Sequence, residues 1–172
     1  MTQLEKAKLK GLDGAQDIDF MFNPTELTFS RSMSIEQSPG ARDKSGQNKT
    51  SFKHPNPYTL KIGNLIFDTY ETQKSVLDQV KKLSKSVEFT DKGKGQNKRP
   101  PIYLFAWGQH DYLRAFVKDF SCRLTLFLPN GTPVRAIIDL TLEQVELPQP
   151  TSDQGPANPS SSDRTASKPL FG

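Results

Sequence analysis

The sequence predicts a mainly β protein, an antiparallel barrel or sandwich of about seven strands with one flanking α-helix. Apolar and polar side chains alternate with a period of two over most of residues 4–147, which is the pattern of half-buried strands. Only residues 72–88 show the spacing of a helix. A change of alternation at Gly63 and Asn64 predicts a β-bulge, and bulges give strands the curvature that a barrel needs.

The chain opens with a predicted hairpin. Residues 4–12 alternate apolar side chains with lysines, and the turn DGAQD leads into a second strand, IDFMF. Three apolar residues of this second strand share one face: Ile18, Phe20 and Phe22. In the first strand Ala7 and Leu9 are expected to lie opposite the three lysines.

Asn23 and Pro24 interrupt the next apolar run. Proline lacks an N–H and biases the preceding residue away from helical geometry, so this dipeptide predicts a corner between two strands. The third strand then runs to Ile35, with four residues on its apolar face: Leu27, Phe29, Met33 and Ile35. Residues 36–57 contain a single large apolar residue, Phe52, and are expected to form a long loop that is functional or disordered.

The second half of the body contains the helix and the last four strands. A bulged strand covers residues 58–71, and the helix of residues 72–88 has an apolar face of Val76, Val80, Leu83 and Val87. PIYLFAWG (101–108) is continuously apolar, as in a strand buried on both faces. The run 112–128 is too long for an average strand and is expected to bend or split around Lys118 and Asp119.

The long run and its return strand are expected to form a hairpin. Its alternation places six residues on one face: Phe116, Phe120, Cys122, Leu124, Leu126 and Leu128. An Asn-Gly turn follows. The return strand has five apolar residues on one face: Val134, Ala136, Ile138, Leu140 and Leu142.

Composition divides the chain into a body, residues 1–147, and a Pro/Ser-rich tail, residues 148–172, that is expected to be flexible. No apolar run approaches the length of a membrane helix, and the N-terminus carries charges where a signal peptide is apolar, so cytoplasmic synthesis is expected. The single cysteine, Cys122, excludes an internal disulfide and is expected to be a small buried apolar side chain.

The net charge of +4 is concentrated in two basic segments, residues 41–53 and 91–101, each with four basic residues and one aspartate. Nucleic-acid binding is not favoured, because no stacking aromatics accompany these charges. His54 and His110 lie away from any nucleophile or ligand set, and no metal or nucleotide motif occurs. We therefore expect no enzyme, no cofactor and no metal, although an enzyme of unrecognised type stays open.

Four segments together resemble a known family. FMFNPTELTFSRS, LIFDTYE, PIYLFAWG and LTLFLPNGTPVRA occur in the order and at about the spacing found in tube-like proteins of contractile injection systems, and residues 4–147 carry the resemblance. In these phage-tail-derived machines a contracting sheath propels an inner tube. The resemblance implies a phage tail-tube-like fold, with two antiparallel sheets closed as a barrel, one flanking helix and six-fold rings. The corner at Asn23 and Pro24 would let strands pass between the sheets.

Within that group the chain looks most like the tube initiator, which sits between the baseplate and the first tube ring. The resemblance implies further copies of the chain, the inner tube protein, and baseplate and spike proteins as partners, without nucleic acid or direct membrane insertion. The chain would then be part of an assembled injection particle. An inner-tube subunit, another baseplate ring subunit, and a small basic β-barrel that binds nucleic acid remain alternatives.

The resemblance also suggests which residues serve assembly. In tube-like relatives the region that corresponds to residues 36–56 reaches the adjacent subunit or ring. Four residues are expected to meet acidic groups there: Arg42, Lys44, Lys49 and Lys53. Phe52 would be the apolar anchor, with Lys92 and Lys94 as further candidates, whereas the alternative is a solvated loop without a partner.

The C-terminal segment departs from the family pattern. Many relatives continue through a Pro/Ser linker into a LysM module that fastens the ring to the baseplate. Residues 148–172 have the linker composition without a module after them, so that role is not carried over. Leu170 and Phe171 are candidates for a short docking peptide, the alternative being a frayed end.

Overall fold

The computed structural model describes residues 3–42, 44–46, 48–90 and 98–146. One helix, α1 (Leu77–Ser84), continues into a 3₁₀ turn, η1 (Lys85–Val87). In chain order the strands are β1 (Ala7–Gly11), β2 (Ile18–Asp19), β3 (Thr28–Ser30), β4 (Met33–Arg42), β5 (Asn48–Pro55), β6 (Thr59–Asp68), β7 (Ile102–Trp107), β8 (His110–Phe127) and β9 (Pro133–Gln144).

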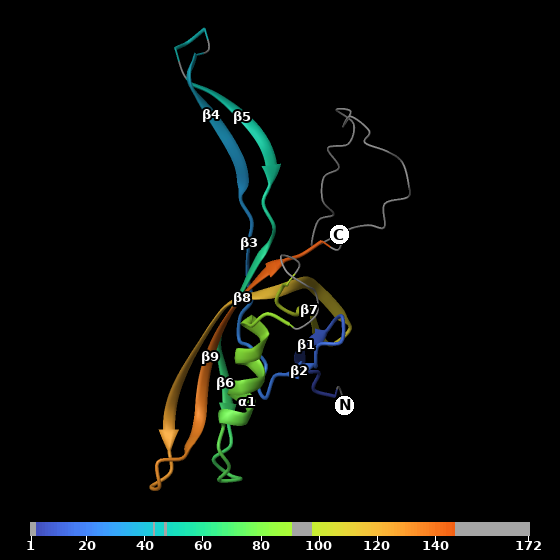
Figure 1. Cartoon of the computed structure of the whole chain (residues 1–172), viewed down its shortest axis with the longest axis vertical. Coiled ribbons are helices and arrows are strands. Elements are labelled where there is room, and N and C mark those ends of the chain that lie inside the picture. Colours follow the sequence, from blue (N-terminus) through green and yellow to red (C-terminus); the bar gives the residue numbers. More distant parts are fainter. Residues whose placement is uncertain (1–2, 43, 47, 91–97, 147–172) are drawn as a thin grey trace.

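Seven strands form one antiparallel sheet in the order β2-β1-β7-β8-β9-β6-β3, and this sheet curls into a half-barrel with α1 against it (Figure 1). The remaining two strands, β4 and β5, form a separate two-stranded sheet that projects far from the half-barrel. The prediction of a mainly β, barrel-like fold with one helix is therefore confirmed. The expected barrel of two antiparallel sheets is replaced by one curled seven-stranded sheet.

The core lies on the concave side of the half-barrel. All five predicted apolar residues of β9 are buried, and β6 faces them with Leu60, Ile62, Leu65 and Phe67. Ala7 and Leu9 of β1, which were expected opposite the lysines, are also buried. Burial of aliphatic side chains of this size contributes roughly 1.5–3 kcal/mol each, so this shared face is the main source of stability.

The helix covers part of this core through Val76 and Leu83, which are fully buried, and Val80, which is partly buried. It is shorter than the predicted span of 72–88, because residues 69–75 form turns and Gln73 has a positive φ of 51°. Val87 was predicted to be on the apolar face, but it is 39% exposed. The backbone tightens from α to 3₁₀ geometry at Lys85, which changes the direction of the side chains that follow.

The predicted bulge in β6 is confirmed, because the register with β9 shifts between Ile62 and Leu65. Asn64 has a positive φ of 53°, which a β-strand residue does not adopt. Its backbone N–H donates a hydrogen bond of 2.8 Å to Oδ1 of Asp139 on β9. This carboxylate supplies a partner for a donor that the bulge displaces from the ladder.

The predicted bend in the long strand is also confirmed, since β8 is one 18-residue strand whose register with β9 shifts between Val117 and Asp119. The extra residue reverses the alternation. Before the shift, Leu113, Ala115 and Val117 are buried, and after it the half-buried apolar residues have even numbers. The prediction that Phe116 shares a face with Phe120 is therefore wrong.

The corner at Asn23 and Pro24 joins the two edges of the curled sheet, because β2 and β3 are its first and last strands. Asn23 is fixed at the start of β1, where its Oδ1 accepts from the N–H of Ala7 at 2.8 Å and its Nδ2 donates to the carbonyl of Glu5 at 2.8 Å. The chain thus crosses between edges of one sheet. Phe22 lies in this crossing and is 53% exposed, so its predicted place on the buried face of Ile18 is wrong.

The predicted third strand is divided. Thr28–Ser30 forms β3 beside β6, whereas Met33 and Ile35 belong to β4 and leave the half-barrel with the second sheet. The expected common apolar face from Leu27 to Ile35 is therefore wrong beyond Phe29. Leu27 and Phe29 pack against the core, but Met33 and Ile35 do not.

Candidate assembly surfaces

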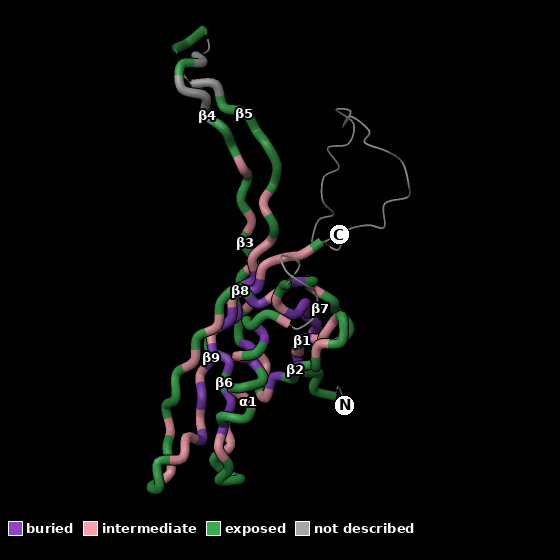
Figure 2. Tube along the Cα trace, viewed as in Figure 1, coloured by how far each residue is buried: buried purple, intermediate pink, exposed green. Residues whose placement is uncertain are grey.

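The segment expected to be a long loop is a β-hairpin. We call β4, β5 and the turn between them the arm. Its strands pair antiparallel, with Ile35 opposite Phe52 and Gln37 opposite Thr50. None of the arm residues whose burial the structure describes is buried (Figure 2). Polar residues can therefore occupy both faces, and the alternation by which a strand is recognised in a sequence is weak.

One face of the arm carries an apolar stripe, which consists of Met33, Ile35 and Phe52. Ile35 and Phe52 lie directly opposite each other, and Met33 is two residues from Ile35 on the same strand. The three side chains are 51%, 52% and 69% exposed. A two-stranded ribbon is marginally stable by itself in water, and a cluster of exposed apolar side chains marks an interaction surface.

The basic residues predicted for the arm have different surroundings. Lys44 is exposed in the turn at the tip. Lys53 forms an ion pair of 3.1 Å with Glu36 across the arm, so the chain itself already supplies an acidic partner. Arg42 and Lys49 belong to β4 and β5. The other candidates, Lys92, Lys94, Leu170 and Phe171, lie outside the described residues.

A second surface, which the sequence analysis missed, lies along β8. Strand β7 pairs with β8 only as far as Phe116, whereas β9 pairs with β8 as far as Phe127. Among the described residues, β8 from Lys118 to Phe127 therefore has a strand on one side only. Such an edge offers its free N–H and C=O groups to another chain.

Apolar side chains lie beside this open edge. Phe120, Cys122 and Leu124 are paired directly with the buried residues Leu140, Ile138 and Ala136 of β9, and cross-strand partners lie on the same face of a sheet. We call these three residues of β8 the β8 strip. Phe120 and Cys122 are half-buried and Leu124 is 37% exposed. The rest of the chain therefore covers this part of the core face of the sheet only partly.

The sequence contained a signal for this surface. The apolar run of residues 112–128 is about twice as long as PIYLFAWG, with which it forms a hairpin. Two strands of such unequal length leave part of the longer one without a partner on that side. The length difference therefore predicts an open edge, which the alternation alone does not.

Cys122 lies in the β8 strip and is half-buried, so the expectation of full burial is only partly met. Burial raises the pKa of its thiol, which keeps the sulfur protonated at neutral pH. A protonated thiol is a weak nucleophile and a small apolar group. Cys122 is therefore suited to packing at this surface.

A groove of about 690 Å³ lies between α1 and the turn that joins β1 to β2. Lys81, Lys82 and Lys85 line its helical side, while Asp13 and Asp17 line the opposite side. Arg99 also lines it and is ion-paired with Asp13. Because both signs of charge are present, the groove has no clear preference for an anion or a cation.

The described residues include no group of three or more His, Cys, Asp and Glu side chains that could hold a metal ion. His54 is exposed on β5, and His110 is exposed at the start of β8 with its ring 6.0 Å from that of Tyr112. In the part of the chain that the structure describes, no helix is long and apolar enough to cross a membrane.

Comparison with known proteins gives a family for this arrangement. Residues 1–152 match the family described as contractile injection system tube protein. No curated protein sequence matches the chain. The family match covers most of the chain and includes every strand described above, so the protein belongs to the contractile injection system tube protein family.

Proposed function

We propose that the chain forms a six-fold ring that joins the baseplate of an injection particle to its inner tube and starts tube assembly. The observation that supports the ring best is the open edge of β8 beside the partly exposed β8 strip. A strand from a neighbouring copy would pair with this edge and cover the apolar side chains. Both contacts are of the kind that stabilises sheet-mediated assembly.

A ring needs two different surfaces on each copy, because each subunit contacts one neighbour with one surface and the next neighbour with another. The half-barrel has a second open edge. Strand β3 pairs with β6 only over Thr59–Lys61, so β6 from Ile62 to Phe67 has a strand only on its β9 side among the described residues, while the N–H of Asp68 donates to Sδ of Met21. The edges of β8 and β6 are suited to heterologous, head-to-tail contacts, which close into a ring when the rotation permits.

The arm supplies a contact in another direction, since it projects away from the half-barrel (Figure 1). We assign its apolar stripe, with Phe52 as the anchor, to a neighbouring subunit or an adjacent ring. Arg42, Lys44 and Lys49 would add ionic contacts with acidic groups there. Single exposed pairs contribute under about 1 kcal/mol each, but a six-fold assembly repeats them.

The resemblance of the four segments supports a position at the baseplate, and an inner-tube subunit is the main alternative. Both are ring subunits, but their copy numbers differ. A subunit that starts the tube forms a single ring at one end of the tube, so its copy number is independent of tube length. A subunit of the tube body increases in number with length.

The test is to count copies of this chain in purified particles whose tubes have been assembled to different lengths. Quantitative mass spectrometry with isotope-labelled peptides from β6 and β9 gives the number relative to a baseplate protein. Six copies at every length would support the proposed position. A number that rises in proportion to tube length would assign the chain to the tube body, and its absence from particles would overturn both positions.

A further inference from the structure

Two short connections join the arm to the half-barrel. Arg31 and Ser32 link β3 to β4, and the segment that begins at Asn56 links β5 to β6. A connection of this kind would act as a hinge if nothing held it. Two hydrogen bonds join its two sides: the N–H of Asn56 donates to the carbonyl of Ser32 at 2.8 Å, and its Nδ2 donates to Oγ of Ser32, also at 2.8 Å.

The same asparagine also binds Ser34, at the start of the arm, and Arg31, in the connection that precedes it. Its Oδ1 accepts a hydrogen bond of 3.1 Å from Oγ of Ser34, and its carbonyl accepts one of 2.8 Å from Nε of Arg31. Asn56 thus takes part in four hydrogen bonds that span the two connections. Its side chain binds to both sides of the point at which the arm leaves the sheet.

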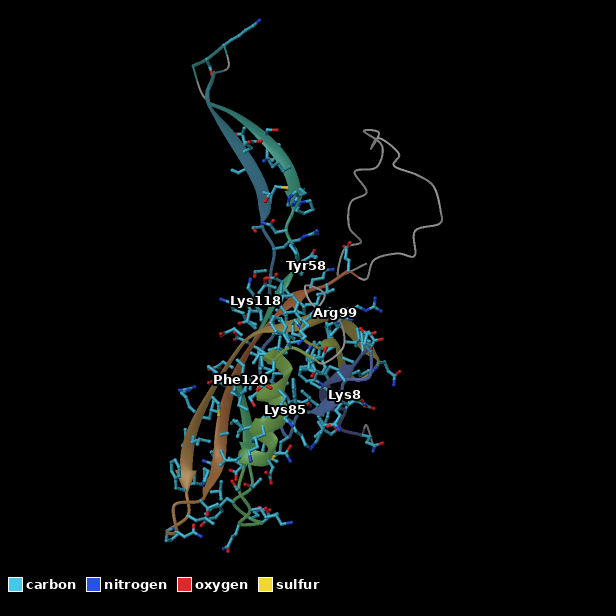
Figure 3. All side chains as sticks on the ribbon, viewed as in Figure 1. Lys8, Tyr58, Lys85, Arg99, Lys118 and Phe120 are labelled. Atoms are coloured by element: carbon cyan, nitrogen blue, oxygen red, sulfur yellow. The ribbon has the colours of Figure 1, made fainter. Side chains whose placement is uncertain are left out.

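These contacts continue into the half-barrel. The guanidinium of Arg31 lies 4.6 Å from the ring centroid of Tyr58, within the range of a cation–π contact. Tyr58, labelled at the root of the arm in Figure 3, donates its N–H to Oε1 of Gln144 at 3.1 Å. The N–H of Gln144 donates in return to the carbonyl of Tyr58 at 2.9 Å. Gln144 is the last residue of β9.

We propose that Asn56 is the positioning residue of the arm, and that Arg31 and Tyr58 connect it to the end of β9. The side-chain amide fixes the angle between the arm and the half-barrel before a neighbour binds. The end of β9, from which the C-terminal segment continues, belongs to the same bonded unit. The angle of the arm therefore depends on the bonds at that strand end.

The energetic consequence follows from preorganisation. An arm that samples many angles presents its apolar stripe in the binding orientation for only a fraction of the time, and the apparent affinity falls by that fraction. Loss of the two side-chain bonds of Asn56 is expected to lower the population of the fixed angle about tenfold. The fold of the half-barrel does not depend on these bonds, because its core residues lie elsewhere.

The test uses the full-length chain with the variant Asn56→Ala. Spin labels on cysteines introduced at Thr50 in the arm and Asp19 in β2, in a Cys122→Ser background, report the distance between the arm and the half-barrel. Asn56→Ala is expected to broaden this distance distribution while the melting temperature changes little. Asn56→Asp keeps the acceptor for Ser34 and should give an intermediate width. Asn130→Ala, in the β8–β9 turn, is the matched control and should leave the width unchanged.

A second measurement tests the connection to β9. Gln144→Ala is expected to broaden the same distribution, and its effect should not add to that of Asn56→Ala, because both act through one bonded unit. The proposal would be overturned if Asn56→Ala gave a distance distribution as narrow as that of the wild type and centred on the same distance. Independent, additive effects would overturn the connection to β9.

The consequence for assembly rests on the proposed function, so it is measured separately. Asn56→Ala should slow ring or tube formation by about tenfold, and Asn130→Ala should not. A broadened distance distribution without slower assembly would leave the positioning role in place and would contradict the assignment of the arm to assembly. A narrow distance distribution with slower assembly would contradict the positioning role of Asn56 and would leave the assignment of the arm to assembly in place.

Discussion

The carboxylate of Asp68, at the end of β6, accepts a hydrogen bond of 2.8 Å from Nε of Arg135 on β9. The backbone N–H of Tyr70 donates to the same carboxylate at 2.8 Å. The bond from Tyr70, followed by that from Arg135, lowers the pKa of Asp68 below its usual value. The ionised form is therefore favoured in the folded chain, and folding depends on pH at this position.

Asp68→Asn is expected to lower the melting temperature at pH 7 by about 2–4 °C, as expected for a lost interaction of about 1 kcal/mol in a chain of this size. The folded-state pKa is lowered, so the stabilisation is complete above the unfolded value of about 3.9 and is lost as the pH falls through the folded value. The difference between Asp68→Asn and wild type should therefore shrink below about pH 4. Thermal melts at pH 7 and pH 3 check this, and an equal difference at both would contradict it.

The backbone at Asn64 leads to a second prediction. Its φ of 53° is accessible to glycine and asparagine but costs a β-branched residue about 1–2 kcal/mol. Asn64→Val should destabilise the chain by roughly that amount, whereas Asn64→Gly should change stability by less than about 0.5 kcal/mol. Urea denaturation measures both. A harmless Asn64→Val would show that the bulge is not required at this position.

The arm gives a prediction in which stability and assembly separate. Ile35→Ala with Phe52→Ala should change the free energy of unfolding of the isolated chain by less than about 0.5 kcal/mol, because both side chains are more than half exposed. The same double variant should abolish or strongly reduce assembly. Ile138→Ala, which removes a buried residue, is the contrasting variant and should cost about 2–5 kcal/mol in the isolated chain. Normal particle yield with the double variant would reject the assigned role of the stripe.

The edge of β8 is tested by charge. Leu124→Lys places an ammonium group in the β8 strip, where a neighbouring subunit would have to bury it, so ring formation should fall by at least tenfold. Ser121→Lys adds the same charge on the other face of the strand, because the exposed Ser121 alternates with Phe120 and Cys122, and it serves as the control. Analytical ultracentrifugation compares the two. Equal ring formation by both variants would show that the strip is not part of the interface.

The sequence predicted those elements whose pattern is set by burial within one chain. All five predicted residues of β9 are buried, and the change of alternation at Asn64 gave the bulge, because a β-strand against a core has one face that must be apolar. The same reasoning failed at Phe116. A bend near Lys118 was expected there, but the alternation was continued through it without the reversal of faces that the extra residue causes. The helix start was wrong because turns and a helix share the same polar residues near Thr72.

The candidate site was less predictable, for a related physical reason. The arm does not pack into the core of the isolated chain, so its strands lack the alternation that a core would impose, and residues 36–57 were expected to be a loop. Phe52 was identified as an anchor, but its cross-strand partner Ile35 was assigned to a buried face. Lys53 was expected to seek a partner outside the chain and has Glu36 within it. The pairing between strands determines the structure of the arm and the partners of Ile35 and Lys53, and the composition of the sequence does not reveal that pairing.

The order of the strands affects how the protein folds during its synthesis on the ribosome. Strand β1 pairs with β7, so Ala7 must wait for Trp107 to be synthesised before its ladder can form. Until then the N-terminal hairpin has no partner for its apolar face, and Leu9 and Phe20 remain accessible to water. Pairings between such distant residues make folding slow and leave the nascent chain open to aggregation. The first strand to be made is thus among the last to complete its pairing, and its apolar side chains stay exposed for most of translation.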